Sequence, residues 1–341
     1  MHRYMGEGLK LGSRIALIAN DALGNFAVSS PVAQVLRTMY QPSVLDGFTG
    51  SRVMEIATEC SWFDEVVSVY GDGPRVVAER ILAREPYDLV VNIENAAWAK
   101  SLVPLLAGED GGAIGPAANR DGRGDLDYGN SPEGRLWADP KWTRDSLRID
   151  FPFLSTGHIS EIVCRCCYWD GRIPAYNLPK HDPGREIPDV LISATASLPD
   201  KLWPVDRWID LMNLIAADGR TIGLLGAKPK AGSEFWRGVD DETRIVEESP
   251  VEDLRGEFTL PQVVGALDQA QLVVTLDNGI LHFACSTDTP VVGLFRNGIH
   301  RLWAPPVPNL KVVEPGVGGH VSDLSLERVW DGIKNFQIQL A

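Results

Sequence analysis

The sequence lacks the features that mark several large classes of protein. No stretch approaches the ~20 consecutive apolar residues of a membrane-spanning helix. The first apolar run, Ile15 to Ala19, is short and is followed by Asn20, so it predicts neither a signal peptide nor an anchor. Lys and Arg number 32 against 46 Asp and Glu, a formal net charge of -14. This balance argues against binding nucleic acid or an anionic membrane over a broad basic face.

Cysteine is scarce, and five residues at these spacings do not predict a disulfide framework. Three of them cluster as Cys164, Cys166 and Cys167, without a second Cys/His pair at a zinc-finger spacing. We interpret this cluster as apolar packing on a helix rather than as a metal site. The composition indicates a cytoplasmic protein of a reducing compartment.

Several catalytic motifs are also missing. The sequence has no Walker A loop and no Gly-x-Ser-x-Gly elbow, which argues against a P-loop enzyme and a serine hydrolase. Neither the turn at residues 20–25 nor the segment Gly223–Gly226 completes the glycine fingerprint of a dinucleotide site. Asp125 and Asp127 form an Asp-x-Asp pair within a polar loop rather than at a strand end, and chance explains it better than metal binding.

Short β-branched runs alternate with helical patterns in both halves of the chain, which predicts α/β architecture with parallel sheets. A length of 341 residues favours about two domains. The expected strands are residues 14–20, 44–48, 65–70 and 88–94 in the first half, and 189–195, 221–226, 244–247, 272–276 and 290–295 in the second. The expected helices are residues 27–39, 155–168, 205–217, 260–269 and 326–336.

These patterns divide the chain at a Pro-rich linker, residues 173–188. We expect an N-terminal domain over 1–180, a C-terminal domain over 185–324, and a last helix over 325–341 that packs back toward the N-terminal domain. Residues 108–134 are Gly-rich and polar, which predicts a long mobile loop. Two such domains would face each other across a cleft, the usual place for a ligand.

Two segments of the second half could bind phosphate. In residues 277–284 a strand passes through Gly279 into a helix, and such a junction offers backbone N–H groups to an anion. In residues 193–197 small hydroxyl side chains follow a strand, and Lys201 could neutralise a phosphate bound there. The alternatives stay open: Asp277 or Asn278 could only cap the helix while His282 packs, and Lys201 could lie on an exposed turn.

The order of these segments resembles glycosyltransferase family 9, the heptosyltransferase-like enzymes of the GT-B superfamily. The second half carries the resemblance through SATASLPDKLWPVDRWIDLM, TIGLLGA, the long segment from DLRGEFTL to TPVVGLF, and LWAPP. The first half fits less tightly, through RIALIANDALGNFAVSSPVAQVLRTMY and YDLVVNIENAAWAKSLVPLLAG. The resemblance implies two Rossmann-like domains. It also implies an inverting sugar transfer from a nucleotide-sugar, usually ADP-heptose, to a hydroxyl acceptor without a metal or other cofactor.

The resemblance also assigns residues. The C-terminal domain would hold the donor through Asp277, Asn278 and Gly279, with His282 close by. Its phosphates would meet further donor-binding candidates, namely Thr195, Ser197, Lys201 and Arg296. The sequence departs from the family at Asn278, where the family has Ser or Thr, and at Ile280, where the family usually has Pro.

The largest departure is Asn25, where the family carries the Asp that deprotonates the acceptor, because an amide cannot take up a proton at neutral pH. Asp21 is the first substitute as catalytic base and Glu94 the second; Asn25 could still hydrogen-bond the acceptor. A second hypothesis is a nucleotide-sugar-binding or regulatory protein that has lost turnover. A third is another α/β enzyme, such as a nucleotide-sugar epimerase or an oxidoreductase.

The partners expected are a nucleotide-sugar donor and an acceptor of unassigned type. Lipopolysaccharide core, another surface glycan and a small secondary metabolite all fit the second role. Nucleic acid is not an expected partner, and peripheral association with a membrane stays open.

Overall fold

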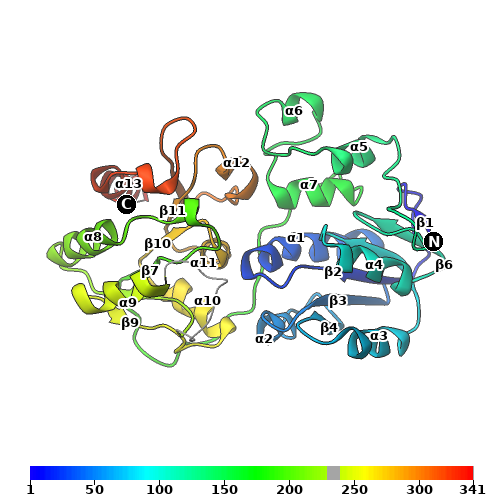
Figure 1. Cartoon of the computed structure of the whole chain (residues 1–341), viewed down its shortest axis with the longest axis horizontal. Coiled ribbons are helices and arrows are strands. Elements are labelled where there is room, and N and C mark those ends of the chain that lie inside the picture. Colours follow the sequence, from blue (N-terminus) through cyan, green and yellow to red (C-terminus); the bar gives the residue numbers. More distant parts are fainter. Residues whose placement is uncertain (229–238, 341) are drawn as a thin grey trace. The chain divides into compact units, whose positions relative to one another are not determined.

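The computed structural model describes residues 1–228 and 239–340, and the chain divides into two compact units, Met1–Asn177 and Leu178–Ala341. The boundary falls inside the Pro-rich stretch of residues 173–188. Each unit contains a parallel six-stranded sheet with helices between its strands (Figure 1). The prediction of α/β architecture with two parallel sheets is therefore confirmed.

The sheet of the first unit has the strand order β1-β6-β5-β2-β3-β4, and every pair in it is parallel. All four strands predicted in this half form, within two residues of the expected ends. The strands are β1 (His2–Arg3), β2 (Arg14–Ile18), β3 (Val44–Gly50), β4 (Glu65–Tyr70), β5 (Tyr87–Asn92) and β6 (Ala107–Ile114).

Helices pack on this sheet through apolar side chains that alternate along the strands. Ala16 and Ile18 of β2 join a core with Leu102 and Val103 of α4 (Ala97–Leu106) and with α3 (Pro74–Leu82). Because successive side chains of a strand point to opposite faces, the residues of β2 that alternate with Ala16 and Ile18 pack on the other face of the sheet. The unit's other helices are α1 (Leu23–Tyr40), α2 (Met54–Ala57), α5 (Pro132–Ala138), α6 (Leu147–Asp150) and α7 (Ile159–Cys166).

The prediction of a loop over residues 108–134 is wrong at both ends of that segment. Its first part forms β6, which pairs with β5 and β1, and its last part begins helix α5. A side chain at Gly112 would meet Tyr4 at 3.1 Å, and one at Gly111 would meet the Tyr87 carbonyl at 2.8 Å. Glycine therefore lets neighbouring groups approach this strand closely, although it removes the apolar pattern by which a strand is predicted.

The sheet of the second unit has the order β12-β11-β10-β7-β8-β9 and is also parallel. The predicted strand 272–276 is β10 (Leu272–Leu276) without change. The remaining strands are β7 (Val190–Ser193), β8 (Ile222–Leu224), β9 (Glu252–Asp253), β11 (Val291–Leu294) and β12 (Leu310–Val313).

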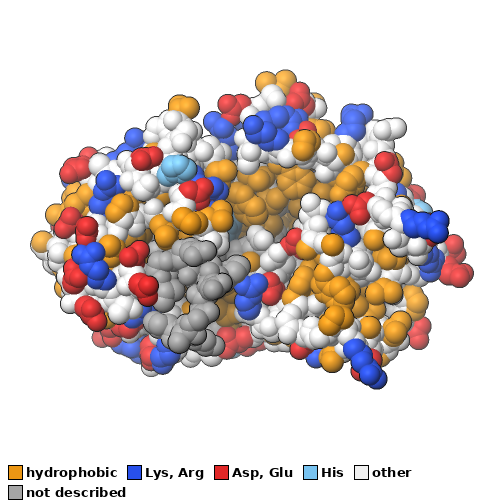
Figure 2. All heavy atoms as spheres, in the orientation of Figure 1, with side chains coloured by type: hydrophobic (Ala, Val, Ile, Leu, Met, Phe, Trp, Pro, Cys, Tyr) orange, Lys and Arg blue, Asp and Glu red, His pale blue; other side chains and the backbone are white. Residues whose placement is uncertain are grey.

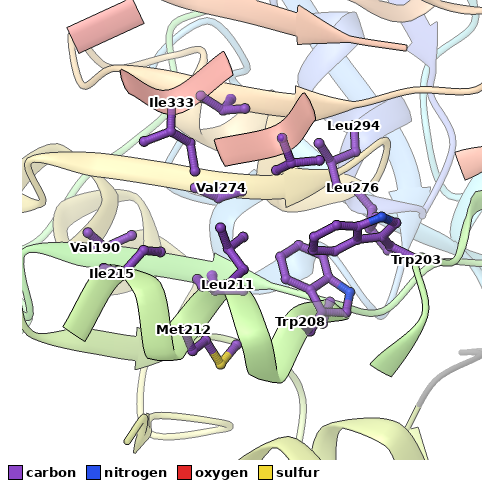
Figure 3. Packing of buried hydrophobic residues seen from close by; sticks show 14 of the residues in the cluster. Val190, Trp203, Trp208, Leu211, Met212, Ile215, Val274, Leu276, Leu294 and Ile333 are labelled. Carbon is purple, nitrogen blue, oxygen red and sulfur yellow. The ribbon is translucent and has the colours of Figure 1, made fainter. Parts of the chain in front are cut away.

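The core of this unit lies between the sheet and α8 (Val205–Ala217), as Figure 3 shows. Leu211 and Ile215 of α8 lie against Val190 and Val274 of the strands, and Trp203 packs edge-on against Trp208 with 4.9 Å between ring centroids. Helices α10 (Leu260–Gln269) and α11 (Gly279–Ala284) contact each other, and α11 contacts β10 and β11. The predicted cap of α10 is present, since Thr259 and Gln262 form a reciprocal capping box.

One prediction for this half is corrected. Residues 244–247 belong to helix α9 (Val239–Glu248) rather than to a strand, because Ile245 and Val246 pack on the core while Arg244 pairs with Glu248 one turn later. The last helix is α13 (Leu326–Leu340), and its apolar side chains Val329 and Ile333 lie in the core of the second unit. Packing of this helix toward the first unit stays a prediction.

The surface mixes charges of both signs. On the face shown in Figure 2, Lys and Arg side chains lie among Asp and Glu side chains on each unit. No helix within residues 1–228 or 239–340 is long and apolar enough to cross a membrane.

Candidate functional site

The predicted site residues of each unit gather where its strand order reverses. In the first sheet β2 lies between β3 and β5, so chain segments after β2 and β5 diverge at that point. In the second sheet β7 lies between β8 and β10, and the same reversal occurs. Open parallel sheets bind ligands just beyond the carboxyl ends of strands at such a switch point. Asp21 and Glu94 lie there in the first unit, and Thr195 and Asp277 in the second.

Lys201 and Asp277 form the centre of the site in the second unit. The Lys201 ammonium lies 2.8 Å from Asp277 Oδ2 and donates a 3.1 Å hydrogen bond to the Asp277 carbonyl. Lys201 comes from the 3₁₀ turn η1 (Pro199–Lys201), whereas Asp277 follows β10. Their side chains are only 15% and 5% exposed. The alternative of an exposed surface lysine is therefore wrong.

Asn278 is fully engaged within the protein. Its Oδ1 accepts hydrogen bonds from the Leu281 N–H and the Thr275 hydroxyl, which makes it the N-cap of α11. Its Nδ2 donates to Ser193 Oγ at 3.1 Å and to the Thr195 carbonyl at 2.9 Å. The side chain thus joins β7 to β10. This contact explains the amide in place of Ser or Thr, because a hydroxyl can cap the helix but is shorter.

The helix that follows offers less to a phosphate than the sequence suggested. Helix α11 has six residues, and Asn278 already satisfies one of its first N–H groups. His282 is buried on this helix, where burial and the nearby Lys201 lower its pKa to about 3, so the imidazole is neutral at physiological pH. Its ring packs edge-on against Trp303 with 6.4 Å between centroids. We therefore assign no cationic role to His282.

The loop after β7 presents Thr195 and Ser197, which are both partly exposed. A buried acid that the sequence analysis missed, Glu242 of α9, hydrogen-bonds the Thr195 side chain. Burial raises the pKa of Glu242 to about 8, and Arg255, 3.9 Å away, only partly offsets this. Arg255 is held instead by Asp253, through contacts of 2.8 and 2.9 Å.

Arg296 follows β11 at the same edge of the sheet. Its guanidinium lies 2.5 Å from Asp200, the residue before Lys201 in η1. The sequence predicts Arg296 as a cation for the donor, but its pairing with Asp200 has no sequence signal. Both cations proposed for the donor are thus paired with carboxylates of their own unit.

In the first unit, Asp21 is held by an arginine. Arg52 lies just beyond the end of β3, and its Nη2 and Nε donate to the two Asp21 oxygens at 2.7 and 3.0 Å. The carboxylate lies over Gly50, where an added Cβ would come within 2.3 Å of the Asp21 Cβ. A bidentate guanidinium contact gives each carboxylate oxygen one charged hydrogen-bond donor and fixes the side chain in place.

Glu94 has neutral partners instead. It follows β5 and accepts hydrogen bonds from the Asn20 side-chain amide and from the Ala96 N–H at 3.1 Å. Tyr70, whose hydroxyl is buried and has no hydrogen-bond partner among the described residues, has its pKa raised by burial and by the charges of Glu94 and Asp21.

Asn25 lies in the first turn of α1 and is partly exposed, and no hydrogen bond of its side chain occurs within the described residues. The amide could therefore still bind an acceptor group. Asp21 and Glu94 both lie at this edge of the sheet. They differ in their partners, because Asp21 pairs with a guanidinium whereas Glu94 accepts hydrogen bonds from amides.

The cysteine cluster has the structural role that was expected. Cys164, Cys166 and Cys167 are buried free thiols at the end of α7, and burial raises their pKa values. Within residues 1–228 and 239–340, no group of three or more His, Cys, Asp or Glu side chains is placed to hold a metal ion.

The residues of this site lie in a segment that is similar to known proteins. The family model of glycosyltransferase family 9 (heptosyltransferase) matches residues 175–319, the part that contains Thr195, Lys201, Asp277 and Arg296. Lipopolysaccharide heptosyltransferase 3 of Escherichia coli is 28% identical over 36% of this chain, and the match spans only 34% of that relative. Lipopolysaccharide heptosyltransferase 2 of Salmonella typhimurium is 20% identical over 83% of this chain and 82% of its own length.

The fold agrees over nearly the whole chain. A glycosyltransferase family 9 protein from Veillonella parvula superposes with a TM-score of 0.72 at 17% identity, covering 98% of this chain and all of its own. Residues 175–319 are thus similar to glycosyltransferase family 9, and the whole chain shares the fold of a solved protein of that family. Its fold is therefore GT-B, as the resemblance implied.

Two further solved structures of similar fold contain a nucleotide or a metal. The Escherichia coli heptosyltransferase WaaC with ADP has a TM-score of 0.64 at 16% identity, covering 95% of this chain and 99% of its own. TibC of enterotoxigenic Escherichia coli, described as iron-containing and dodecameric, has a TM-score of 0.61 at 13% identity, covering 98% of this chain and 80% of its own. Because TibC contains iron, similarity of fold to these proteins does not by itself exclude a metal.

Proposed function

We propose that this protein transfers a heptose-like sugar from ADP-heptose to a hydroxyl acceptor, with inversion at the anomeric carbon and without a catalytic metal. The observation that carries the proposal is the Lys201–Asp277 pair, buried at the switch point of the second sheet within the segment that matches the family. The ADP of the related WaaC structure motivates the choice of nucleotide.

The donor would bind at the carboxyl edge of the second sheet. We expect the diphosphate to take the Lys201 ammonium and the Arg296 guanidinium as its charged partners, with the Thr195 hydroxyl as a neutral one. Asp277 would orient Lys201 and accept hydrogen bonds from the sugar. Fixed cations of this kind stabilise the negative charge that develops on a leaving nucleoside diphosphate.

The acceptor would be activated at the carboxyl edge of the first sheet. Its oxygen attacks the anomeric carbon as the bond from that carbon to the phosphate oxygen breaks, and ADP leaves with the electron pair. We propose Glu94 as the base that takes the acceptor proton. Arg52 donates a hydrogen bond to each oxygen of Asp21, whereas the partners of the Glu94 carboxylate within residues 1–228 and 239–340 are neutral amides. A positioned base contributes about 10²- to 10⁴-fold to the rate.

The acceptor class stays a proposal, with lipopolysaccharide core as the first choice because the curated relatives are lipopolysaccharide heptosyltransferases. We also retain a cytoplasmic location, which the five free thiols favour because such residues persist in reducing compartments.

A second function is favoured by one specific observation. Asn25 cannot act as the family's base, and the adjacent carboxylate of Asp21 is held by Arg52. A protein that binds a nucleotide-sugar without transferring it would fit this arrangement equally well.

The deciding experiment incubates the full chain with ADP-heptose and a panel of truncated lipopolysaccharide cores, and measures released ADP and glycosylated product. Acceptor-dependent ADP release supports the transferase. Binding of ADP-heptose in calorimetry without release across the panel supports the binding protein. If neither ADP-heptose nor ADP binds, the donor assignment is wrong.

A further inference from the structure

The short turn η1 places two opposite charges side by side, and each reaches a different strand end. Asp200 contacts Arg296 beyond β11, and Lys201 contacts Asp277 beyond β10. Strands β10 and β11 are neighbours, with Leu276 level with Leu294. Neighbouring strands are about 4.8 Å apart, so the two ion pairs occupy one small area of the sheet edge.

These four side chains sum to zero charge. A nucleoside diphosphate that approached them would find each cation already neutralised by a carboxylate. It must therefore replace a carboxylate as the partner of at least one cation.

The Arg296–Asp200 pair is incompletely made. It has one short contact, from Nη1 to Oδ2, while Arg296 Nε and Asp200 Oδ1 are both buried without a hydrogen-bond partner among the described residues. Arginine and carboxylate usually pair through two parallel hydrogen bonds, as Arg52 and Asp21 do in the first unit. A buried N–H without a hydrogen-bond partner costs free energy. A second anion at Arg296 could therefore be stabilised by accepting the hydrogen bond that Nε does not donate to Asp200.

We propose that Asp200 competes with the donor's diphosphate for Arg296, and thereby sets how strongly the site discriminates ligands by their phosphate charge. This inference rests on the donor site of the proposed function and adds a positioning residue to it. Asp200 holds Arg296 while the site is empty, weakens binding of the diphosphate, and takes Arg296 back when ADP leaves.

The test measures binding of adenosine, AMP and ADP to the full chain by calorimetry, for wild type, Asp200→Asn, Arg296→Met and the double variant. Asp200→Asn should tighten ADP binding by about two- to fivefold, the range of a partly exposed charge pair, and should tighten AMP less. Adenosine affinity should not change. In the Arg296→Met background the effect of Asp200→Asn should disappear.

The matched control is Asp268→Asn. Asp268 also pairs with one cation, Lys180, and its side chain is 32% exposed against 33% for Asp200, but it lies near the end of α10 just before the amino end of β10. This control should leave all three affinities unchanged. Thermal unfolding of each variant shows that it is folded, and Asp200→Ser gives a second neutral replacement.

Each outcome decides the inference. Weaker ADP binding in Asp200→Asn would mean that Asp200 only orients Arg296, and equal changes for adenosine and ADP would mean a structural effect; both overturn the competition. If Arg296→Met weakens ADP binding but Asp200→Asn leaves it unchanged, the inference fails and the proposed donor site stands. If wild type binds none of ADP, UDP and GDP, the proposed donor site fails and the role of Asp200 with it.

Discussion

Lys201 illustrates how a single side chain gains a defined role from its neighbours. The ammonium is held by both the carboxylate and the carbonyl of Asp277, so its position is fixed before any ligand arrives. A cation fixed in this way needs little reorganisation to meet a phosphate.

The first prediction concerns this cation. Lys201→Ala should weaken ADP binding by about 10- to 100-fold, the range for losing a hydrogen bond to a charged group. Lys180→Ala is the control, because Lys180 is an exposed lysine of the same unit that also pairs with one aspartate. Calorimetry with ADP checks both variants, and equal affinities would remove Lys201 from the donor site.

The second prediction separates the two candidate bases. Glu94→Gln should lower kcat by about 10²- to 10⁴-fold with little change in ADP affinity, whereas Asp21→Asn should lower it much less. The isosteric amides keep the shape of each side chain. Steady-state rates of ADP release with a productive acceptor provide the measurement.

A larger loss in Asp21→Asn than in Glu94→Gln would reverse the assignment and show that Arg52 leaves Asp21 during turnover. Asn25→Asp introduces a carboxylate at the position where the family carries its base. An increase in rate would show that the first turn of α1 still presents its side chain to the acceptor.

At the scale of elements, the helices and strands that could be predicted are those with a clear apolar pattern or a recognisable capping residue. Strand β10 and helix α8 have the expected limits, because LVVTL is a continuous buried run and α8 repeats its apolar positions with helical spacing. Strand β6 was missed because glycine carries no hydrophobic signal. Helix α9 was taken for a strand because Ile245 and Val246 are β-branched residues in a short window.

The site was predicted only in part for a related reason. Lys201 and Asp277 follow recognisable strand ends, so the sequence could name them. Arg52 and Asp200 act through partners on other elements, and which elements become neighbours depends on strand order, which local sequence does not encode.

The third prediction concerns an element boundary. Thr259→Ala removes the capping box of α10 and should destabilise the second unit by about 1 kcal/mol. Asn213→Ala, an exposed position within α8, is the control and should change stability by less than about 0.5 kcal/mol. Urea unfolding followed by circular dichroism gives both values. Equal midpoints for wild type and Thr259→Ala would mean that solvent replaces the cap.

At the scale of the whole molecule, two buried groups give stability opposite dependences on pH. The folded state keeps His282 neutral down to a pKa of about 3, so acid favours the unfolded chain below about pH 6.5, where a free histidine protonates. Glu242 has a folded pKa of about 8, so between about pH 4.5 and 8 the folded state holds a proton that the unfolded chain releases. Stability from this group therefore falls as pH rises through that window.

The fourth prediction follows from Glu242. Glu242→Gln should remove this loss, so the stability difference between the variant and wild type should grow in the variant's favour from pH 5 to pH 8. Glu247→Gln on the exposed side of the same helix is the control and should show no such trend. Chemical unfolding at four pH values measures the difference. A constant difference would mean that Glu242 is already ionised in the folded protein.

The amide of Asn278 bears on how this protein could be redesigned. Its oxygen accepts a hydrogen bond at the start of α11, and its nitrogen donates hydrogen bonds to Ser193 and Thr195 at the end of β7. Randomising that position to obtain new sugar preferences would therefore mostly return loosened proteins. Libraries aimed at substrate scope should keep Asn278 and vary the partly exposed Ser197 instead.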